Sequence, residues 1–505
     1  MTWSRLGAAA VALATGLGAA CSCSCVGDDG VTLPRGYNTA KGRSIVVDPL
    51  APMASPFDAV DALNGIVGAP AGADTASAAI SAAYGGGDGA RVTLVAVGPD
   101  GGCALGLDAI FAGPSASATA PASYDFDALD AAFDSVAAAG SARVLWRAGF
   151  GGDACEPARA LLGTPTKLGD VLVGVVRHLA GGASWDPAGR RFAAPRVEVL
   201  GDADALLAAG ASPTGLVAAY VGAARAVRAA FPAGGELDVP VGGVGFTVTA
   251  GASAAAIALP EALLAFLDGV AADGAPLDFV TIRAVTATPY GARAVADAVR
   301  AALDARDLGA TELLLTALAP ADVAPFGDAS LDSAYVGAFE VAARAYLQDA
   351  EGVGAALSGL APSAYFAADG APLPAFMARY GLDQLDGDER LTVTLGGDRE
   401  GMAVLAARPK GSVTLVRVLV VNANVDAGAA SLTYDLRLPA FVAPAVRRVD
   451  YRIAVLDHRT RGLGSFVWSE VGSLEPGLAT GDVHLAREMP VPGVHLIELE
   501  RVLAP

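Results

Sequence analysis

Two carboxylates follow a segment that has the composition of a buried strand. Residues 195 to 204 read Pro-Arg-Val-Glu-Val-Leu-Gly-Asp-Ala-Asp, so Asp202 and Asp204 stand in the turn after the apolar run. Neighbouring carboxylates can share a proton as an acid pair or bind a cation. An aspartate directly before a helix can instead cap its first turn. The residues alone leave the acid pair, the cation site and the helix cap open as interpretations.

Histidine, the commonest metal ligand and general base, is rare in this chain. Its four histidines are His178, His458, His484 and His495. They are too few and too scattered for a histidine-rich metal centre, and we expect neither a metal nor a cofactor. His178 falls on an apolar helical segment and is expected to be a hydrogen-bonded core residue. No nucleophile elbow, phosphate-binding loop or zinc-protease motif is present.

The N-terminus predicts export. Arg5 precedes a short apolar run, and residues 1–20 have the pattern of a signal peptide that ends in small residues before Cys21. This resembles a bacterial lipidation site with Cys21 as the lipidated residue, and residues 21–43 would form a tether. The alternative is ordinary signal-peptide cleavage near Ala20. We expect contact with a membrane only through the lipid, at the outer membrane or the cell surface, because no later run is long enough to span one.

Two further cysteines lie in the body of the chain, at Cys103 and Cys155. An exported protein can keep disulfides, so a bridge between them is one prediction, and two buried thiols are the alternative. The net charge of −19 argues against nucleic-acid binding and against attraction to anionic lipid head groups. It names no ligand.

Strand-like and helical segments alternate through residues 44–386. The first strand-like segment is Ile45–Asp48. The later ones are residues 91–97, 142–146, 196–200, 238–242, 277–282 and 312–318, and the helical ones are residues 126–139, 168–179, 216–231, 259–272, 292–308 and 333–348. Such alternation predicts a parallel sheet with crossover helices, and seven or eight units favour a (β/α)8 TIM barrel.

The pattern changes after about residue 386. Residues 387–505 lack helical periodicity and contain short strand-like runs joined by turns. This predicts a C-terminal all-β sandwich domain.

In a TIM barrel, functional residues follow the strands, at their carboxyl ends. Reading the residues after each predicted strand gives candidates for a binding cleft, and Trp146 is a candidate for stacking on a sugar ring. Besides Asp202, the candidates are Asp153, Asp204, Arg283, Tyr290 and Trp146.

The order of motifs resembles glycoside hydrolase family 39, which contains β-xylosidases and α-L-iduronidases. The resemblance runs from about Ile45 to Leu499. The segments that carry it are Leu129–Asp134 with Ala148–Phe150, Pro195–Asp204, Pro276–Thr281, Leu313–Leu318 and Asp450–Ile453 with Trp468. It implies a barrel with an appended sandwich and hydrolysis of glycosides with retained configuration.

The catalytic positions depart from that family. Its acid/base glutamate aligns with Asp202, its asparagine with Gly201, and its nucleophilic glutamate with Ala317. Retention needs two carboxyl groups roughly 5–5.5 Å apart, and Ala317 has no nucleophilic atom. Glu312 lies five residues earlier, near the bottom of the barrel and, by its odd spacing, on the other face of the strand. Glu198 is expected to be a buried structural residue.

These observations support three hypotheses. The first is an exported, catalytically degenerate glycosidase-like lipoprotein that binds a glycan or an envelope protein. The second is an active, xylosidase-like glycoside hydrolase with relocated carboxylates; an inverting scheme with Asp202 and Asp153 roughly 6.5–9.5 Å apart would be one form of it. The third is a structural scaffold of the cell envelope.

Overall fold

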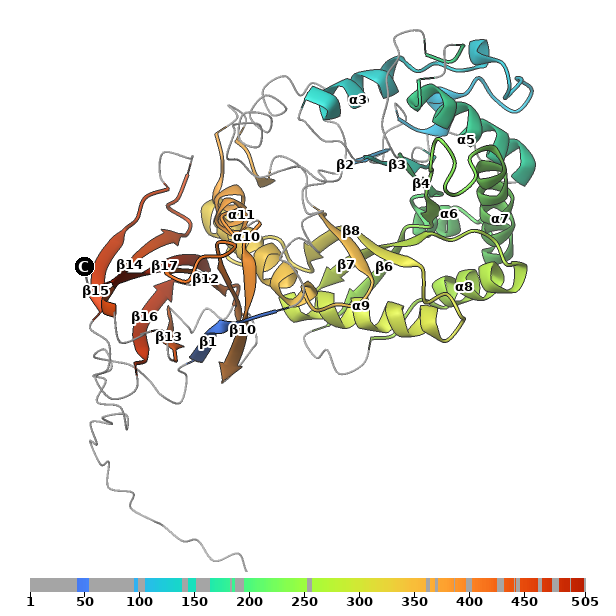
Figure 1. Cartoon of the computed structure of the whole chain (residues 1–505). Coiled ribbons are helices and arrows are strands. Elements are labelled where there is room, and N and C mark those ends of the chain that lie inside the picture. Colours follow the sequence, from blue (N-terminus) through green and yellow to red (C-terminus); the bar gives the residue numbers. More distant parts are fainter. Residues whose placement is uncertain are drawn as a thin grey trace, which may run out of the picture.

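A computed structural model describes most of the chain beyond residue 42. The described ranges are 43–53, 95–98, 105–138, 144–150, 164–181, 184–186, 195–251, 257–359, 364–367, 371–385, 387–396, 402–424, 431–439, 441, 446–461, 466–474, 481–490 and 492–503. Within them the chain forms a helix-covered parallel sheet and a β domain (Figure 1).

The parallel sheet is that of a TIM-type barrel, as predicted. Its strands follow one another in chain order, β2-β3-β4-β5-β7-β8-β9, and β6 also pairs with β7. Every pair is parallel because a helix or a long connection separates consecutive strands. The bounds are β2 Val95–Val97, β3 Val144–Ala148, β4 Arg196–Val199, β5 Val241–Gly243, β6 Phe246–Ala250, β7 Phe279–Thr286, β8 Glu312–Pro320 and β9 Val353–Ser358.

Helices cover the outer face of this sheet (Figure 1). The major ones begin and end within a few residues of the predicted segments. They are α3 Asp127–Ala138, α5 Pro165–Leu179, α7 Pro213–Ala230, α8 Glu261–Asp273, α9 Pro289–Asp304 and α10 Ala329–Leu347. Shorter helices are α2 Leu107–Ile110, α6 Ala203–Ala208, α11 Pro374–Asp383 and the 3-10 turn η2 Pro121–Ser123.

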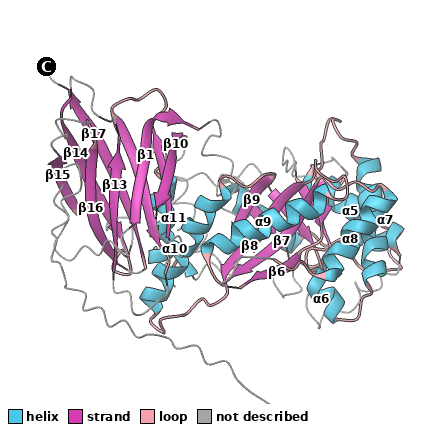
Figure 2. Cartoon of the chain, turned by 90° about the horizontal axis from the view of Figure 1, so that it is seen from below, coloured by secondary structure: helices cyan, strands magenta, loops and turns pink. Residues whose placement is uncertain are grey.

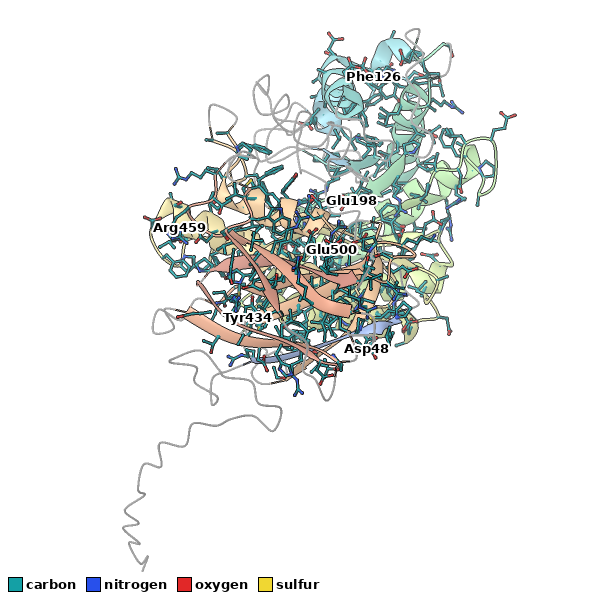
Figure 3. All side chains as sticks on the ribbon, turned by 60° about the vertical axis from the view of Figure 1, so that its left-hand side comes forward. Asp48, Phe126, Glu198, Tyr434, Arg459 and Glu500 are labelled. Carbon is teal, nitrogen blue, oxygen red and sulfur yellow. The ribbon has the colours of Figure 1, made fainter. Side chains whose placement is uncertain are left out.

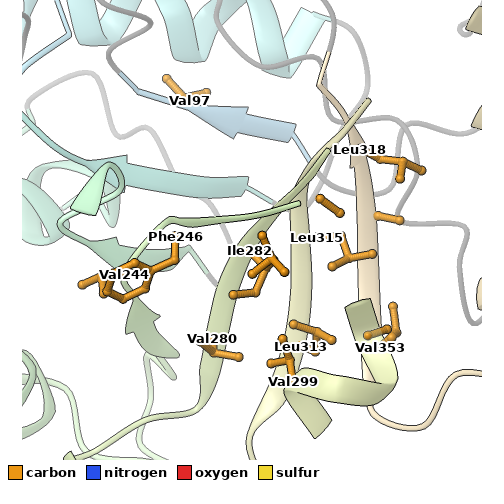
Figure 4. Close-up of a cluster of buried hydrophobic side chains, with 14 of the residues drawn as sticks. Val97, Val244, Phe246, Val280, Ile282, Val299, Leu313, Leu315, Leu318 and Val353 are labelled. Carbon is orange, nitrogen blue, oxygen red and sulfur yellow. The ribbon is translucent and has the colours of Figure 1, made fainter. Parts of the chain in front are cut away.

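Side chains on the two faces of the sheet belong to separate cores. The large outer core packs strand residues such as Val97, Ile282 and Leu315 with the covering helices (Figure 4). A small inner cluster lies on the opposite face and fills the barrel. Its members are Ala96, Leu145, Phe279, Leu314, Ala355 and Leu357.

The β domain is a sandwich of mostly antiparallel strands, as predicted. The order of its strands is β15-β14-β17-β12-β11-β10-β1-β13-β16. They are β10 Glu389–Gly396, β11 Met402–Arg408, β12 Leu415–Asn422, β13 Ser431–Leu438, β14 Val446–Leu456, β15 Glu470–Leu474, β16 Val483–Pro490 and β17 Gly493–Leu503. Figure 2 shows these strands on one side of α10 and α11 and the barrel strands on the other.

One boundary predicted from the sequence is wrong. The strand-like segment at Ile45–Asp48 is predicted to open the barrel, but β1 (Arg43–Pro52) lies in the β domain. It pairs antiparallel with β10 and parallel with β13. Ile45 and Val47 are fully buried in the sandwich core. The apolar alternation identifies a half-buried strand but not its partners, which lie roughly 340 to 390 residues further along the chain.

Candidate functional site

A buried ion pair supports the turn that carries Asp202. Arg147 of β3 and Glu198 of β4 are register partners, and their Nε and Oε2 atoms lie 2.6 Å apart. Both side chains are buried, and Glu198 lies inside the barrel part of the molecule (Figure 3). A second guanidinium nitrogen of Arg147 donates to the carbonyl of Gly201 at 2.6 Å. Glu198 is therefore the structural residue expected, and it acts through Arg147 on the turn.

The turn itself has an unusual backbone. Leu200 adopts a φ of 61°, in the left-handed region that non-glycine residues rarely occupy. The amides of Leu200 and Gly201 both donate to the carbonyl of Ala148, at 2.8 and 3.2 Å. Together with Arg147, these bonds hold the chain in this conformation, which sets the direction in which Asp202 leaves β4.

Asp202 caps a helix and faces an arginine. Its Oδ1 accepts a hydrogen bond from the amide of Ala205 at 3.1 Å, as the N-cap of α6. Its Oδ2 lies 3.4 Å from Nη1 of Arg283. Asp202 is 40% exposed and Arg283 is 28% exposed. One oxygen of Asp202 thus accepts from a helix amide, and the other faces a guanidinium.

Arg283 pairs in the sheet with Ala317, the residue that aligns with the nucleophile in the resemblance to family 39. The register of β7 and β8 shifts by one residue, so that Ile282 pairs with Leu315 and Arg283 with Ala317. Thr316 is the extra residue of this bulge. Ala317 is therefore the register neighbour of Arg283, the residue whose guanidinium lies 3.4 Å from Asp202.

The bulge also corrects the predicted orientation of Glu312. Even spacing relates Glu312 to Leu314 of the inner cluster, so Glu312 faces the inside of the barrel and not the other face. Its Oε2 is paired with Nη1 of Arg196, at the start of β4. The pairing confirms that Glu312 lies at the bottom of the barrel, at the end away from Asp202.

Asp204 does not join Asp202 in an acid pair. Its Oδ2 accepts a hydrogen bond from the amide of Thr247 at 2.7 Å, which ties α6 to β6. In the described part of the chain, no cluster of three or more histidine, cysteine or acidic residues could hold a metal ion.

Trp146 is not a cleft residue. It is fully buried and belongs to the outer core with Val97, its register partner. The reason is strand alternation: Leu145 and Arg147 face the barrel interior, so Trp146 between them faces the helices. Sugar stacking would need an accessible ring, so the prediction for Trp146 is wrong.

Tyr290 lies in the first turn of α9 and is 46% exposed. Its ring packs edge-on against Tyr346 of α10, with centroids 5.2 Å apart. The hydroxyl of Tyr346 donates to the carbonyl of Met402 in the β domain. No contact among the described residues connects Tyr290 with the Asp202–Arg283 pair.

His178 is the satisfied core histidine expected. It is buried, stacks on Phe126 at 3.6 Å and has partners for both ring nitrogens. These are the carbonyl of Trp185 at 2.8 Å and a carboxylate oxygen of Asp130 at 2.7 Å.

Several predicted residues lie outside the described residues, namely Asp153, Cys21, Cys103 and Cys155. A helix of sufficient length and apolarity to cross a membrane does not occur among the residues that are described.

Arg147 is the residue of this site that the sequence did not identify. A charged residue within an apolar strand, Val144–Ala148, is the signal that could have identified it, because buried charges need partners. Gly245 was missed as well. A Cβ atom there would lie 2.3 Å from the carbonyl oxygen of Gly201, so β6 can approach the turn only with glycine at this position.

Comparison with known proteins gives the fold and not the family. No protein-family model matches the chain, and no curated protein matches it. Solved structures do match over almost all of the described fold. A glucosidase from Croceicoccus marinus is 22% identical with a TM-score of 0.64, and the match covers 91% of this chain and 99% of that one.

Two further structures agree. The GH39 enzyme from Xanthomonas axonopodis pv. citri has a TM-score of 0.61 at 18% identity, covering 93% of this chain and 100% of that one. A bacterial orthologue of human α-L-iduronidase has a TM-score of 0.60 at 14% identity, covering 92% and 85%. The chain therefore has a glycoside hydrolase-like fold, a TIM-type barrel with a β domain. At such identities the fold does not carry membership of one family or an activity.

Proposed function

We propose that this chain is a catalytically degenerate, glycosidase-like protein that binds a glycan at the top of its barrel without hydrolysing it. The observation that carries the proposal is the arrangement of Arg283, Ala317 and Asp202. Arg283 is the register neighbour of Ala317 and lies 3.4 Å from Asp202. A cation is thus the sheet neighbour of the position that aligns with the nucleophile.

The chemistry of retention explains why this arrangement favours binding. The nucleophile must attack the anomeric carbon, and the acid must protonate the leaving oxygen. Ala317 has no atom that could form the covalent bond. Asp202 uses its oxygens as acceptors, for Ala205 and Arg283. What remains is a charged and polar rim that could bind sugar hydroxyls.

Binding without turnover can be measured directly. Isothermal titration of the mature protein with xylo- and cello-oligosaccharides should give saturable binding, and the sugars recovered afterwards should be intact. Arg283→Ala should weaken binding about tenfold, as expected for the loss of one hydrogen bond to a charged group. The matched control is Arg293→Ala, which removes an arginine paired with Asp297 on the surface of α9. Shortened oligosaccharides in the recovered sample, or equal loss in both variants, would refute the proposal.

We also propose that the protein is exported and anchored through Cys21, since small residues precede this cysteine after a signal-like run. In a bacterial host, palmitate labelling should be lost in Cys21→Ser and kept in Cys23→Ser. Labelling that survives Cys21→Ser would rule out this anchor.

A further inference from the structure

A cavity of about 330 Å³ lies between α10 and the β domain, where strands β10 and β11 stop pairing with each other. Among the described residues, β10 pairs with β11 only at Glu389 and Arg390, and from there on it pairs with β1. Leu391–Leu395 and Ala403–Ala406 line the gap between the two strands. Tyr346, near the end of α10, and Asp349, just after it, also line the gap. We call this the seam cavity.

The seam cavity contains an unused buried donor. Arg390 lines it and is only 6% exposed. One terminal nitrogen, Nη2, donates to Asp349 at 2.8 Å. The other, Nη1, is buried and has no hydrogen-bond partner among the described residues. Nη1 has almost no accessible surface, so a ligand in the cavity would meet the Arg390–Asp349 pair through Asp349.

The cavity also has an aromatic wall. Tyr346 lines it, and the half-exposed Tyr290 packs edge-on against Tyr346 next to it. Aromatic rings are the usual partners for the apolar C–H faces of sugars. Tyr290, predicted from the sequence as a sugar-cleft residue, thus lies beside the seam cavity and not beside Asp202.

The charges of the lining balance. Arg390 would oppose a cationic ligand, and Asp349, which is 53% exposed, would oppose an anionic one. A volume of about 330 Å³ is at the small end of ligand pockets, so it fits one small molecule. A neutral, polyhydroxylated ring satisfies all of these demands at once.

We infer that the seam cavity binds a neutral saccharide unit. Its hydroxyls donate to Asp349, which Arg390 holds in place, and its apolar ring face packs on Tyr346. This site is separate from the Asp202 turn and does not depend on the function proposed for the barrel.

Saturation-transfer NMR on the full mature chain tests this inference. The probes are xylose, glucose, xylobiose and cellobiose, with glucuronate as the charged comparator. The neutral sugars should receive saturation, and glucuronate should receive at least fivefold less. Thr394→Trp places a bulky ring in the lining of the cavity at an exposed position and should reduce the transfer at least fivefold. Asp349→Asn should raise the dissociation constant for the neutral sugars about tenfold.

Two controls make the result decisive. Ser44→Trp adds the same ring at an exposed position of the neighbouring strand β1, outside the cavity lining, and should behave as the wild type. Transfer is also measured in Arg283→Ala, which weakens sugar binding at the barrel, and adding Thr394→Trp to this variant should reduce the remaining transfer at least fivefold. No transfer to any neutral sugar in Arg283→Ala, or undiminished transfer after Thr394→Trp is added to it, would overturn the inference. If binding were lost in Arg283→Ala but kept in Thr394→Trp, the seam site would fail while the barrel proposal stood.

Discussion

Arg283 of β7 and Ala317 of β8 are direct neighbours in the sheet, and Nη1 of Arg283 lies 3.4 Å from Oδ2 of Asp202. In the resemblance to family 39, Ala317 and Asp202 are the positions that align with the two catalytic carboxyl groups. Asp202 also accepts a hydrogen bond from the amide of Ala205. The chain has a glycoside hydrolase-like fold, and these contacts are the basis of the proposed loss of catalysis.

The Arg147–Glu198 pair should be essential for stability. Arg147→Leu leaves the buried Glu198 without its cation, so the free energy of unfolding should fall by about 3–5 kcal/mol. Urea unfolding followed by tryptophan fluorescence would measure this, because Trp146 lies in the same strand. The double change Arg147→Leu with Glu198→Leu should cost less than Arg147→Leu alone. Arg293→Leu, in an exposed pair, should cost under about 1 kcal/mol. A double variant as unstable as the sum of both single variants would contradict the pairing.

Gly245 should tolerate no side chain. In Gly245→Ala the new Cβ would lie 2.3 Å from the carbonyl oxygen of Gly201 and displace the turn, at a cost of about 1–3 kcal/mol. Gly251→Ala is the matched control just after β6, because its Cβ would meet nothing within 4 Å. Its unfolding free energy should stay within about 0.5 kcal/mol of the wild type. Thermal unfolding of the two variants side by side gives the comparison, and equal stabilities would show that the close approach is not required.

His495 should make the β domain less stable in acid. Burial in the sandwich lowers the pKa of His495 to about 4, and its Nδ1 lies 2.9 Å from the hydroxyl of Tyr434, a residue within the β domain in Figure 3. An unfolded histidine has a pKa of about 6.5, so between the two values the unfolded chain binds more protons. Stability should therefore fall as pH drops from about 6.5 to 4, by up to roughly 3 kcal/mol.

The variant His495→Gln should remove most of that histidine-dependent slope. Urea unfolding at several pH values between 4 and 7 would measure it, with His458→Gln as the control that keeps the wild-type slope. An unchanged slope in His495→Gln would show that other groups cause the acid sensitivity.

Much of the fold is predictable because strand and helix periods are local properties. The helical segment at residues 168–179 and the strand at 312–318 match α5 and β8 closely. Pairing is not local, and so β1 was assigned to the wrong sheet. The predicted direction of the Glu312 side chain is wrong because β8 contains a one-residue bulge. The sequence of Glu312–Pro320 does not indicate that bulge. The inward or outward direction of Trp146 depends on which face of its strand meets the barrel, and a fully apolar strand does not reveal that.

The candidate site was predicted in its sequence positions but not in its contacts. Asp202, Ala317 and Arg283 were identified because they follow or end strands of a predicted barrel. Their mutual arrangement depends on the β7–β8 register shift and on the turn at Leu200, which are set by tertiary packing. The role of Arg147, which supports that turn, depends on its buried ion pair with Glu198, a contact that the sequence does not predict.

The most direct test is hydrolysis of aryl β-xyloside, aryl β-glucoside and aryl α-L-iduronide by the purified mature protein. With no nucleophilic atom at Ala317, the aryl alcohol should be released no faster than without enzyme, and Asp202→Ala should behave as the wild type. Clear turnover that disappears in Asp202→Ala would contradict the account, because it would make Asp202 a working acid despite its contacts with Arg283 and Ala205.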